Sequence, residues 1–209
     1  MEIENKVTLV VDKSLQVLAV LCLSAYVISA VNAANVPVKF VLHFVFVLGV
    51  MGIVTLSNIY LRYNFDAKKI RYYKIGTLLL VLAFFQFTLM TVVQQAMVIT
   101  RANPEFQKPE TIQLFSLLNS VQLGMDVVFD IFYSFGILLV SVSFIAAGPK
   151  TFTGWYGVIM SLSLLVLNLY SFPIPPKENG LVDLGVLTIP WWIIFIIKIK
   201  KSANGKNIW

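Results

Sequence analysis

Long apolar runs separated by short polar loops are the feature that most limits how this sequence can fold. A helix needs about 20 predominantly apolar residues to cross the hydrocarbon core of a bilayer. Six such segments fit the chain, and none of the connections is long enough to hold a soluble domain. The sequence therefore predicts an all-α, polytopic membrane helix bundle that forms a single domain over residues 1–209. The six expected spans are residues 14–31, 38–61, 75–99, 124–147, 153–172 and 181–197.

The composition fits a chain whose solvent is lipid. Hydrophobic residues make up 58% of the 209 residues and charged residues only 12%, which is too little charge to cover a soluble domain of this size. The net charge of +6 therefore does not indicate a nucleic-acid partner, because lysine and arginine in membrane proteins set orientation and meet anionic headgroups. The lipid bilayer is the one partner that the sequence predicts directly, and the oligomeric state stays open.

The sequence offers few ligands for a metal or a metal cofactor. It holds one histidine and one cysteine, so a single chain cannot form the usual closed zinc sites, a bis-histidine haem or a cysteine-ligated iron–sulfur cluster. It also lacks a glycine-rich phosphate loop, a Gly-x-Ser-x-Gly elbow and a His-Glu-x-x-His helix. We therefore expect no cofactor and no metal, and the balance is against an enzyme.

Lysine and arginine are distributed unequally between the two sides of the predicted bundle. The two termini and the second and fourth loops together hold twelve, and the remaining loops hold four. Basic residues are enriched on the cytoplasmic side, so both termini are expected in the cytoplasm and an even number of spans is favoured. The first segment ends at Val31-Asn32-Ala33, which loosely resembles a signal-peptide cleavage site, but the acidic residues ahead of it favour a retained helix.

The fourth segment is longer than a bilayer requires. The proline-free run Glu110–Ala147 has 38 residues, about 57 Å as one helix, whereas the hydrocarbon core is about 30 Å thick. Pro109 is a typical helix start, and Gly148 a typical helix end. We predict an outer amphipathic helix over residues 110–122, a bend near Gly124 and then the span. The alternative is one long tilted helix.

Polar residues of this fourth segment recur at helical spacing. Asn119, Gln122, Asp126, Asp130 and Tyr133 are separated by 3, 4, 4 and 3 positions, which places all five on one face of a helix. A carboxylate at the centre of a bilayer costs about 2.5–3.5 kcal/mol on insertion scales. Two acids one turn apart are tolerated there if they face water or partners, or if one is protonated. The pair is therefore a candidate for function.

Under the predicted topology, polar residues of other spans fall on the same outer side of the membrane. We therefore predict a polar cavity that opens outward and binds a small molecule or an ion. The acid pair is expected to interact with His43 or Arg101. The candidate ligand-binding residues are Asp126, Asp130, His43, Gln122, Asn119, Gln94, Gln95 and Asn168.

Several of these residues also have a purely structural interpretation. Asn168 fits an interhelical hydrogen bond, which is worth about 0.6 kcal/mol in membranes, and His43 fits a packing position on an apolar helix. In the last outer loop, the prolines of residues 173–176 fit the end of the fifth span, and Asn179-Gly180 fits a tight turn. Asp183 fits the N-cap of the sixth span.

Three strings in the C-terminal half carry a resemblance: MDVVFDIFYSFG (125–136), NLYSFPIPP (168–176) and GLVDLG (180–185). Together they resemble a group of small uncharacterised bacterial multi-pass membrane proteins, close to a family defined only as a domain of unknown function. The resemblance covers about residues 119–197. It departs after Gly185, where Val186, Leu187 and the pair Trp191-Trp192 replace an expected proline and single tryptophan. The resemblance implies a bacterial inner-membrane protein and brings no activity or catalytic residue.

Three functions remain open from the sequence. The leading one is a non-enzymatic transporter or sensor that uses the outward-facing polar cavity. The alternative is a structural or interaction protein whose polar residues only join helices. The second alternative is a membrane-embedded enzyme in which Asp126 and Asp130 act as acid and base.

Overall fold

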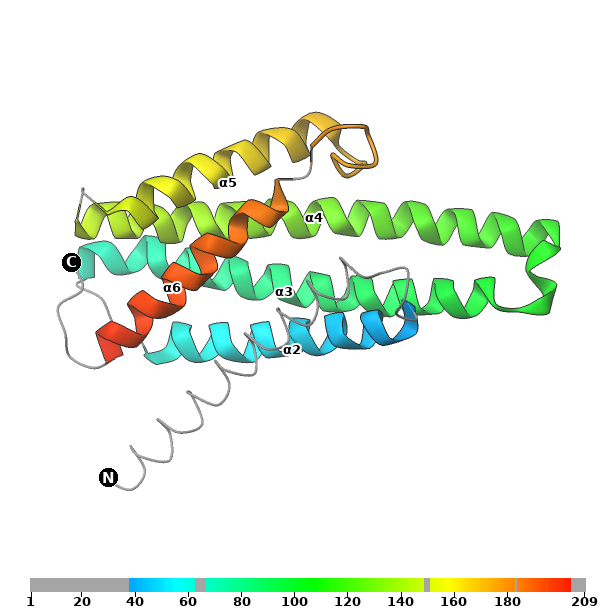
Figure 1. The fold of residues 1–209 in the computed structure, drawn as a ribbon, viewed down its shortest axis with the longest axis horizontal. Helices are drawn as coiled ribbons and strands as arrows, with labels where there is room; N and C mark the ends of the chain where they lie inside the picture. Colours follow the sequence, from blue (N-terminus) through cyan, green and yellow to red (C-terminus); the bar gives the residue numbers. More distant parts are fainter. Residues whose placement is uncertain (1–37, 63–66, 149–150, 183, 204–209) are drawn as a thin grey trace, which may run out of the picture. The chain divides into compact units, whose positions relative to one another are not determined.

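A computed structural model of the chain describes residues 38–62, 67–148, 151–182 and 184–203. Over these residues the chain is helical and contains no strand (Figure 1). The expected first span, residues 14–31, lies outside the described residues. The described elements are α2 (Val38–Arg62), α3 (Ala67–Arg101), the 3-10 helix η1 (Pro104–Gln107), α4 (Pro109–Ala147), α5 (Phe152–Ser171), the 3-10 helix η2 (Gly185–Leu187) and α6 (Thr188–Ala203).

Three described helices are long and apolar enough to cross a membrane. They are Arg71–Arg101 within α3, the whole of α4 and the whole of α5. Shorter apolar helical segments occupy Val41–Ser57 and Gly185–Ile197. The all-helical fold and the three long apolar helices indicate a membrane protein, as the hydropathy of the sequence predicts.

Helix α4 corrects the predicted bend. The helix begins at Pro109 with Glu110 in its first turn, as expected, and then continues to Ala147 without a break at Gly124. The predicted separate outer helix over residues 110–122 is therefore wrong. The segment forms one long helix of 39 residues, which is about 58 Å in length. A lone glycine costs a helix only about 1 kcal/mol, and sharp kinks need a proline or an insertion into the hydrogen-bond ladder.

The start of the last helix is also corrected. Helix α6 begins at Thr188, seven residues after the predicted start at 181, and η2 precedes it. Pro190 gives the physical reason, because proline is accepted in the first turn of a helix and breaks its interior. The Thr188 hydroxyl donates to the Gly185 carbonyl at 2.7 Å. Asp183 lies outside the described residues.

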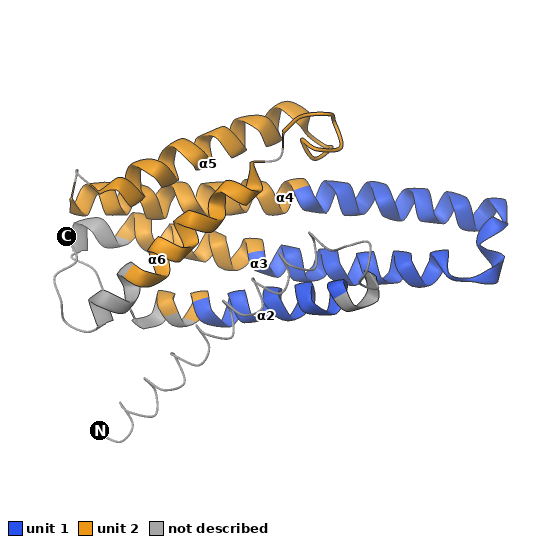
Figure 2. Ribbon diagram, viewed as in Figure 1, with its two compact units in different colours: residues 1–55, 84–126 blue, residues 56–83, 127–209 orange. Residues whose placement is uncertain are grey.

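The described chain divides into two compact units, which Figure 2 distinguishes by colour. The described part of unit 1 comprises residues 38–55 and 84–126, which include the start of α2, the end of α3, η1 and the start of α4. The described part of unit 2 comprises the end of α2, the start of α3, the end of α4 and all of α5, η2 and α6.

Unit 2 is held together by helices whose backbones approach closely. A Cβ added at Gly76 of α3 would lie 2.8 Å from the Gly136 carbonyl oxygen and 2.8 Å from the Val140 nitrogen, both on α4. On the other side of α4, the Trp191 indole of α6 donates to the Ser141 hydroxyl at 3.0 Å. Small residues at helix crossings are the usual means of packing in lipid, where apolar burial drives association less than in water.

Helix α5 shows two opposite faces within unit 2. One face is buried and small or polar, and it includes Gly154, Gly157, Ser161 and Asn168. The other face is exposed and apolar, with Ile159 at 65% and Val166 at 64% exposure. An apolar exposed face and a small, polar buried face are typical of a helix that contacts lipid.

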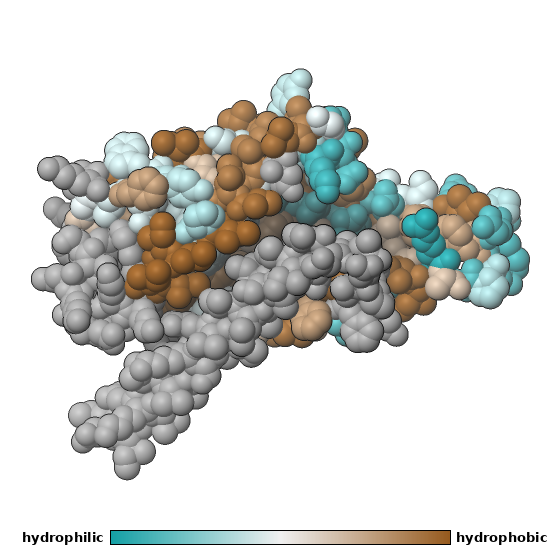
Figure 3. All heavy atoms as spheres, viewed as in Figure 1, coloured by the Kyte–Doolittle hydropathy of each residue, from teal (hydrophilic) through white to brown (hydrophobic). Residues whose placement is uncertain are grey.

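The loop after α5 folds as the sequence predicts. Pro175 and Pro176 are buried, and Gly180 has a φ angle of 77°, a left-handed conformation that glycine adopts without strain. The turn is closed by a hydrogen bond from the Leu181 amide to the Pro176 carbonyl at 2.8 Å. Figure 3 shows hydrophilic side chains over this loop and over the region of η1, and hydrophobic side chains over α6.

Unit 1 packs mainly through side chains. A Cβ added at Gly49 of α2 would meet the Thr88 hydroxyl of α3, and one added at Gly52 would meet the Phe84 ring. Between α3 and α4, the Gln86 amide donates to the Met125 carbonyl at 3.5 Å. Phe106 of η1 meets Phe115 of α4 edge to face, with ring centroids 5.3 Å apart.

Candidate ligand-binding site

A cavity of about 470 Å³ lies within unit 1. It brings together two of the predicted ligand-binding residues, His43 of α2 and Gln95 of α3, which are 52 positions apart in the sequence. A third polar residue, Asn103, precedes η1. The lining residues are Leu42, His43, Gln95, Val98, Ile99, Ala102, Asn103 and Pro104.

The helices explain how these side chains reach one cavity. Leu42 is buried and His43 is exposed, because consecutive residues point about 100° apart around a helix. Gln95 and Val98 are three positions apart on α3, so they share one face, and Ala102 directly follows the end of α3. In the described chain α2 and α3 contact each other through Gly49, one to two turns after His43.

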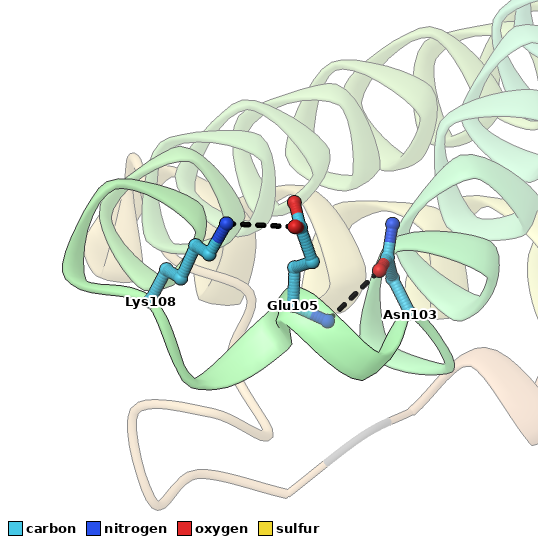
Figure 4. Close-up of polar contacts among 3 residues, drawn as sticks. All are labelled: Asn103, Glu105 and Lys108. Atoms are coloured by element: carbon cyan, nitrogen blue, oxygen red, sulfur yellow. Dashed lines mark hydrogen bonds and ion pairs between the residues drawn. The ribbon is translucent and has the colours of Figure 1, made fainter.

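The wall formed by η1 is fixed by local hydrogen bonds (Figure 4). The Asn103 side-chain oxygen accepts from the Glu105 amide at 2.9 Å, which is an N-cap interaction. The Lys108 ammonium contacts the Glu105 carboxylate at 2.7 Å. This ion pair is exposed and contributes about 0–1 kcal/mol. Because the cap uses the oxygen of Asn103, its amide NH₂ group remains as the donor that this residue can offer to a ligand.

The chemistry of the cavity is mainly apolar with a few polar groups. Five of the eight lining side chains are aliphatic or proline, and the polar three are an imidazole and two carboxamides. No lysine, arginine, aspartate or glutamate lines it. Such walls suit a small molecule that has an apolar body and a polar group, since most ligand pockets combine apolar walls with a few placed polar groups.

The polar face of α4 contributes three candidate residues to unit 1. Asn119, Gln122 and Asp126 are all half-buried, as is Gln94 of α3. None of these four lines the cavity. The side-chain amides of Gln94, Asn119 and Gln122 make no hydrogen bond to other described residues. An amide without a partner is costly in hydrocarbon, so this part of unit 1 is suited to contact with water.

The acid pair is divided by the boundary between the units. Asp126 is the last residue of unit 1, and Asp130 belongs to unit 2. Both are half-buried on the continuous helix α4. Arg101, a predicted partner, is exposed on the last turn of α3 and forms no ion pair with another described residue. No ion pair to Arg101 forms among the described residues, and the predicted interaction of the acids with His43 or Arg101 stays a prediction.

Tyr133 belongs to the packing of unit 2 rather than to an open polar face. It is buried, its hydroxyl donates to the Thr188 hydroxyl at 2.8 Å, and it accepts from the Trp192 indole at 2.6 Å. Its ring also stacks on Phe129 and Trp192. The helical spacing placed Tyr133 on the polar face of the fourth segment, but it could not show that α6 satisfies the Tyr133 hydroxyl.

Asn168 of α5 is fully buried. Its side-chain NH₂ group donates to the Leu164 carbonyl of the same helix at 3.0 Å. Its side-chain oxygen has no hydrogen-bond partner in the part of the chain that the structure describes. The predicted hydrogen bond to another helix is therefore not made by either side-chain atom of Asn168 in this structure.

The sequence analysis missed most of the cavity wall. Val98, Ile99, Ala102 and Pro104 carry no chemical signal, and they line the site because α3 ends beside the start of α2 within unit 1. Asn103-Pro104 was the available signal. An asparagine followed by a proline is typical of a turn or an N-cap, and Asn103 lies eight positions after Gln95.

Comparison with protein-family models, with curated proteins and with solved structures found no match to this chain. The resemblance to a bacterial membrane-protein family therefore stays a prediction.

Proposed function

We propose that this protein binds a small molecule or an ion in an outward-facing cavity of a cell membrane, as a transporter or a sensor. The proposal includes six spans with both termini in the cytoplasm, and the inner membrane of a bacterium as the location. The three long apolar helices support insertion into a membrane. The unequal distribution of lysine and arginine supports the orientation.

The cavity in unit 1 is the observation that carries the proposal. Its volume of about 470 Å³ lies in the range of about 300–1,000 Å³ that is usual for ligand pockets. It contains His43 and Gln95, two of the ligand-binding residues that the sequence predicts. In the predicted topology, the connection between α3 and α4 is on the outer side, so the cavity opens outward.

A structural role is the alternative, and two contacts in unit 2 favour it. Tyr133 is satisfied by Thr188 and Trp192, and the Trp191 indole is satisfied by Ser141. Polar groups in these positions join helices and need no ligand. The two functions differ in unit 1, because a structural protein has no need for a cavity that water can enter.

Access of water to the cavity is the first test. In a Cys22→Ser background, single variants His43→Cys and Gln95→Cys are treated in intact cells with a membrane-impermeant maleimide. Leu89→Cys is the matched control, since Leu89 lies on α3 like Gln95 and is 42% exposed but does not line this cavity. Lys177→Cys, in the exposed loop after α5, is the positive control.

We expect His43→Cys and Gln95→Cys to react and Leu89→Cys to remain unlabelled in lipid. If Lys177→Cys reacts and the two cavity variants do not, the cavity is closed to water and the structural role is the better one. Reaction only after permeabilisation would show that the cavity opens to the cytoplasm, against the proposed orientation. A compound that slows the reaction of Gln95→Cys identifies a ligand.

A further inference from the structure

We infer that unit 2 contains a second site, formed by Asp130, Ser134 and Asn168 between α4 and α5, that binds a small monovalent cation of the Na⁺ type. This inference rests on the proposed function, because it specifies an ion that the protein would bind. The site lies in unit 2 and does not use the cavity of His43 and Gln95.

The register of α4 and α5 places Asn168 level with Asp130. A Cβ added at Gly157 of α5 would meet the Ser141 hydroxyl of α4, so these two positions face each other. Asn168 follows Gly157 by 11 residues, and Asp130 precedes Ser141 by 11 residues. In antiparallel helices, these equal steps of about three turns reach the same level and return to the same face.

Two buried oxygen atoms at this level lack hydrogen-bond partners. The side-chain oxygen of Asn168, which is 0% exposed, and the hydroxyl of Ser134, which is 1% exposed, have no partner among the described residues. Ser134 lies one helical turn from Asp130, on the side of α4 that Ser141 presents to α5. Buried polar atoms are nearly always satisfied by protein, water or an ion, so both atoms require a group that is not among the described residues, and we assign a cation to that place.

The electrostatics of the site favour a cation. Asp130 supplies a carboxylate, and neither α4 nor α5 contains a lysine or an arginine. The Tyr133 hydroxyl lies one turn away, but its single proton is donated to Thr188. Asn168 lies in the last turn of α5, which ends at Ser171, and the C-terminal end of a helix carries partial negative charge.

The types of ligand atom indicate a monovalent ion. An amide oxygen, a hydroxyl and one carboxylate are hard oxygen ligands, which suit alkali and alkaline-earth ions rather than zinc or copper. The described residues include no group of three or more histidine, cysteine, aspartate or glutamate side chains that could hold a metal. A single carboxylate with neutral oxygens matches one positive charge. Transporters commonly place Na⁺ beside the C-terminal end of a helix.

Thermal unfolding of the purified full-length protein tests the site. Unfolding is measured in NaCl, KCl and choline chloride at the same ionic strength, so that general screening is constant. A ligand that binds only the folded state raises the unfolding temperature, and we expect NaCl to do so relative to choline chloride. The NaCl effect should be lost in Asp130→Asn and Asn168→Ala, and it should be kept in the matched controls Glu178→Gln and Ser163→Ala, both at exposed positions.

A second measurement keeps the test decisive if the buried variants do not fold. Trp192 donates to the Tyr133 hydroxyl one turn from Asp130, so binding should change tryptophan emission of the unmodified protein as NaCl replaces choline chloride. The mild variant Ser134→Ala should weaken the apparent Na⁺ affinity by about tenfold. Equal unfolding temperatures and emission in all three salts overturn the inference and leave buried water as the partner of the orphaned atoms.

The outcomes for the two sites are separate. An effect of Na⁺ that persists unchanged in both Ser134→Ala and Asn168→Ala also overturns the inference, because the ion then binds elsewhere. Absence of a Na⁺ effect with maleimide access at Gln95→Cys rejects only the cation site. A Na⁺ effect without maleimide access rejects the cavity and retains the cation site.

Discussion

The two units differ in how they treat polar residues, although both are built from similar apolar helices. In unit 2 the buried Tyr133 and Thr188 and the half-buried Trp192 form a hydrogen-bonded group between α4 and α6. In unit 1 the amides Gln94, Asn119 and Gln122 are only half-buried and have no partner among the described residues. Polar side chains therefore join helices in unit 2, whereas in unit 1 they remain available to water or a ligand.

The two units also differ in how closely the backbones of their helices approach each other. In unit 2 a Cβ at Gly76 would collide with backbone atoms of α4, whereas in unit 1 a Cβ at Gly52 would meet only the Phe84 ring. A side chain can change rotamer, but two packed backbones must move apart as whole helices. We therefore expect unit 2 to tolerate substitution less well than unit 1.

The largest expected effect comes from the tryptophan at the centre of unit 2. Trp191 is 0% exposed, stacks on Phe195 with centroids 4.9 Å apart and donates to Ser141. Trp191→Ala should lower the free energy of unfolding by about 3–5 kcal/mol, because it leaves a large cavity. Phe85→Ala in unit 1, where the ring is 52% exposed, should lower it by under about 1 kcal/mol. Equilibrium unfolding in mixed micelles measures both, and equal losses would remove the contrast between the units.

A smaller effect is expected from a single added methyl group. Gly76→Ala should lower the free energy of unfolding by about 1–3 kcal/mol, because the methyl group forces α3 and α4 apart. Gly124→Ala in unit 1 has open space around the new atom and should raise it by about 0.5–1 kcal/mol through helix propensity. The same unfolding assay compares the two variants. A loss of stability in Gly124→Ala would show that this part of α4 packs against a group outside the described residues.

The smallest effect concerns single polar groups. Tyr133→Phe removes the donor to Thr188 and the acceptor of the Trp192 indole, and it should lower the free energy of unfolding by about 1–2 kcal/mol. Gln122→Leu in unit 1 removes no hydrogen bond and should change it by less than about 0.5 kcal/mol. Trp192 emission provides a second readout for Tyr133→Phe. A large loss in Gln122→Leu would show that the polar face of α4 also joins helices.

Much of the helical architecture follows from the sequence alone. The apolar runs predicted both ends of α2 and α5 and the C-terminal ends of α3 and α4 to within two residues, because hydropathy over about 20 residues reports membrane-spanning length directly. Helices α3 and α4 begin eight and fifteen residues before the predicted spans. Pro109 with Glu110 correctly marked the start of α4, and Asn179-Gly180 correctly marked a turn. These signals are local, so a linear sequence contains them completely.

The start of α6 and the continuity of α4 were also decided locally, but by weaker signals. Pro190 excludes a helix interior and places the start of α6 near Thr188, and Gly124 alone has too small an energetic effect to bend α4. The error at α6 came from giving the hydropathy of the segment more weight than Pro190, and the error at α4 came from giving a single glycine too much weight. The structure corrects them without any long-range contact.

Only the tertiary structure decided what each polar residue does. Tyr133 and Asp130 lie on the same predicted face, yet α6 satisfies the hydroxyl of Tyr133, and the close approach of Gly157 to Ser141 sets the register of α5 against α4. His43 and Gln95 share a cavity because α2 and α3 pack together within unit 1. Helical periodicity fixes the direction of a side chain around its own axis, but its partner depends on which helix crosses there and in which register. Those are properties of packing between distant segments, and the sequence by itself does not contain them in readable form.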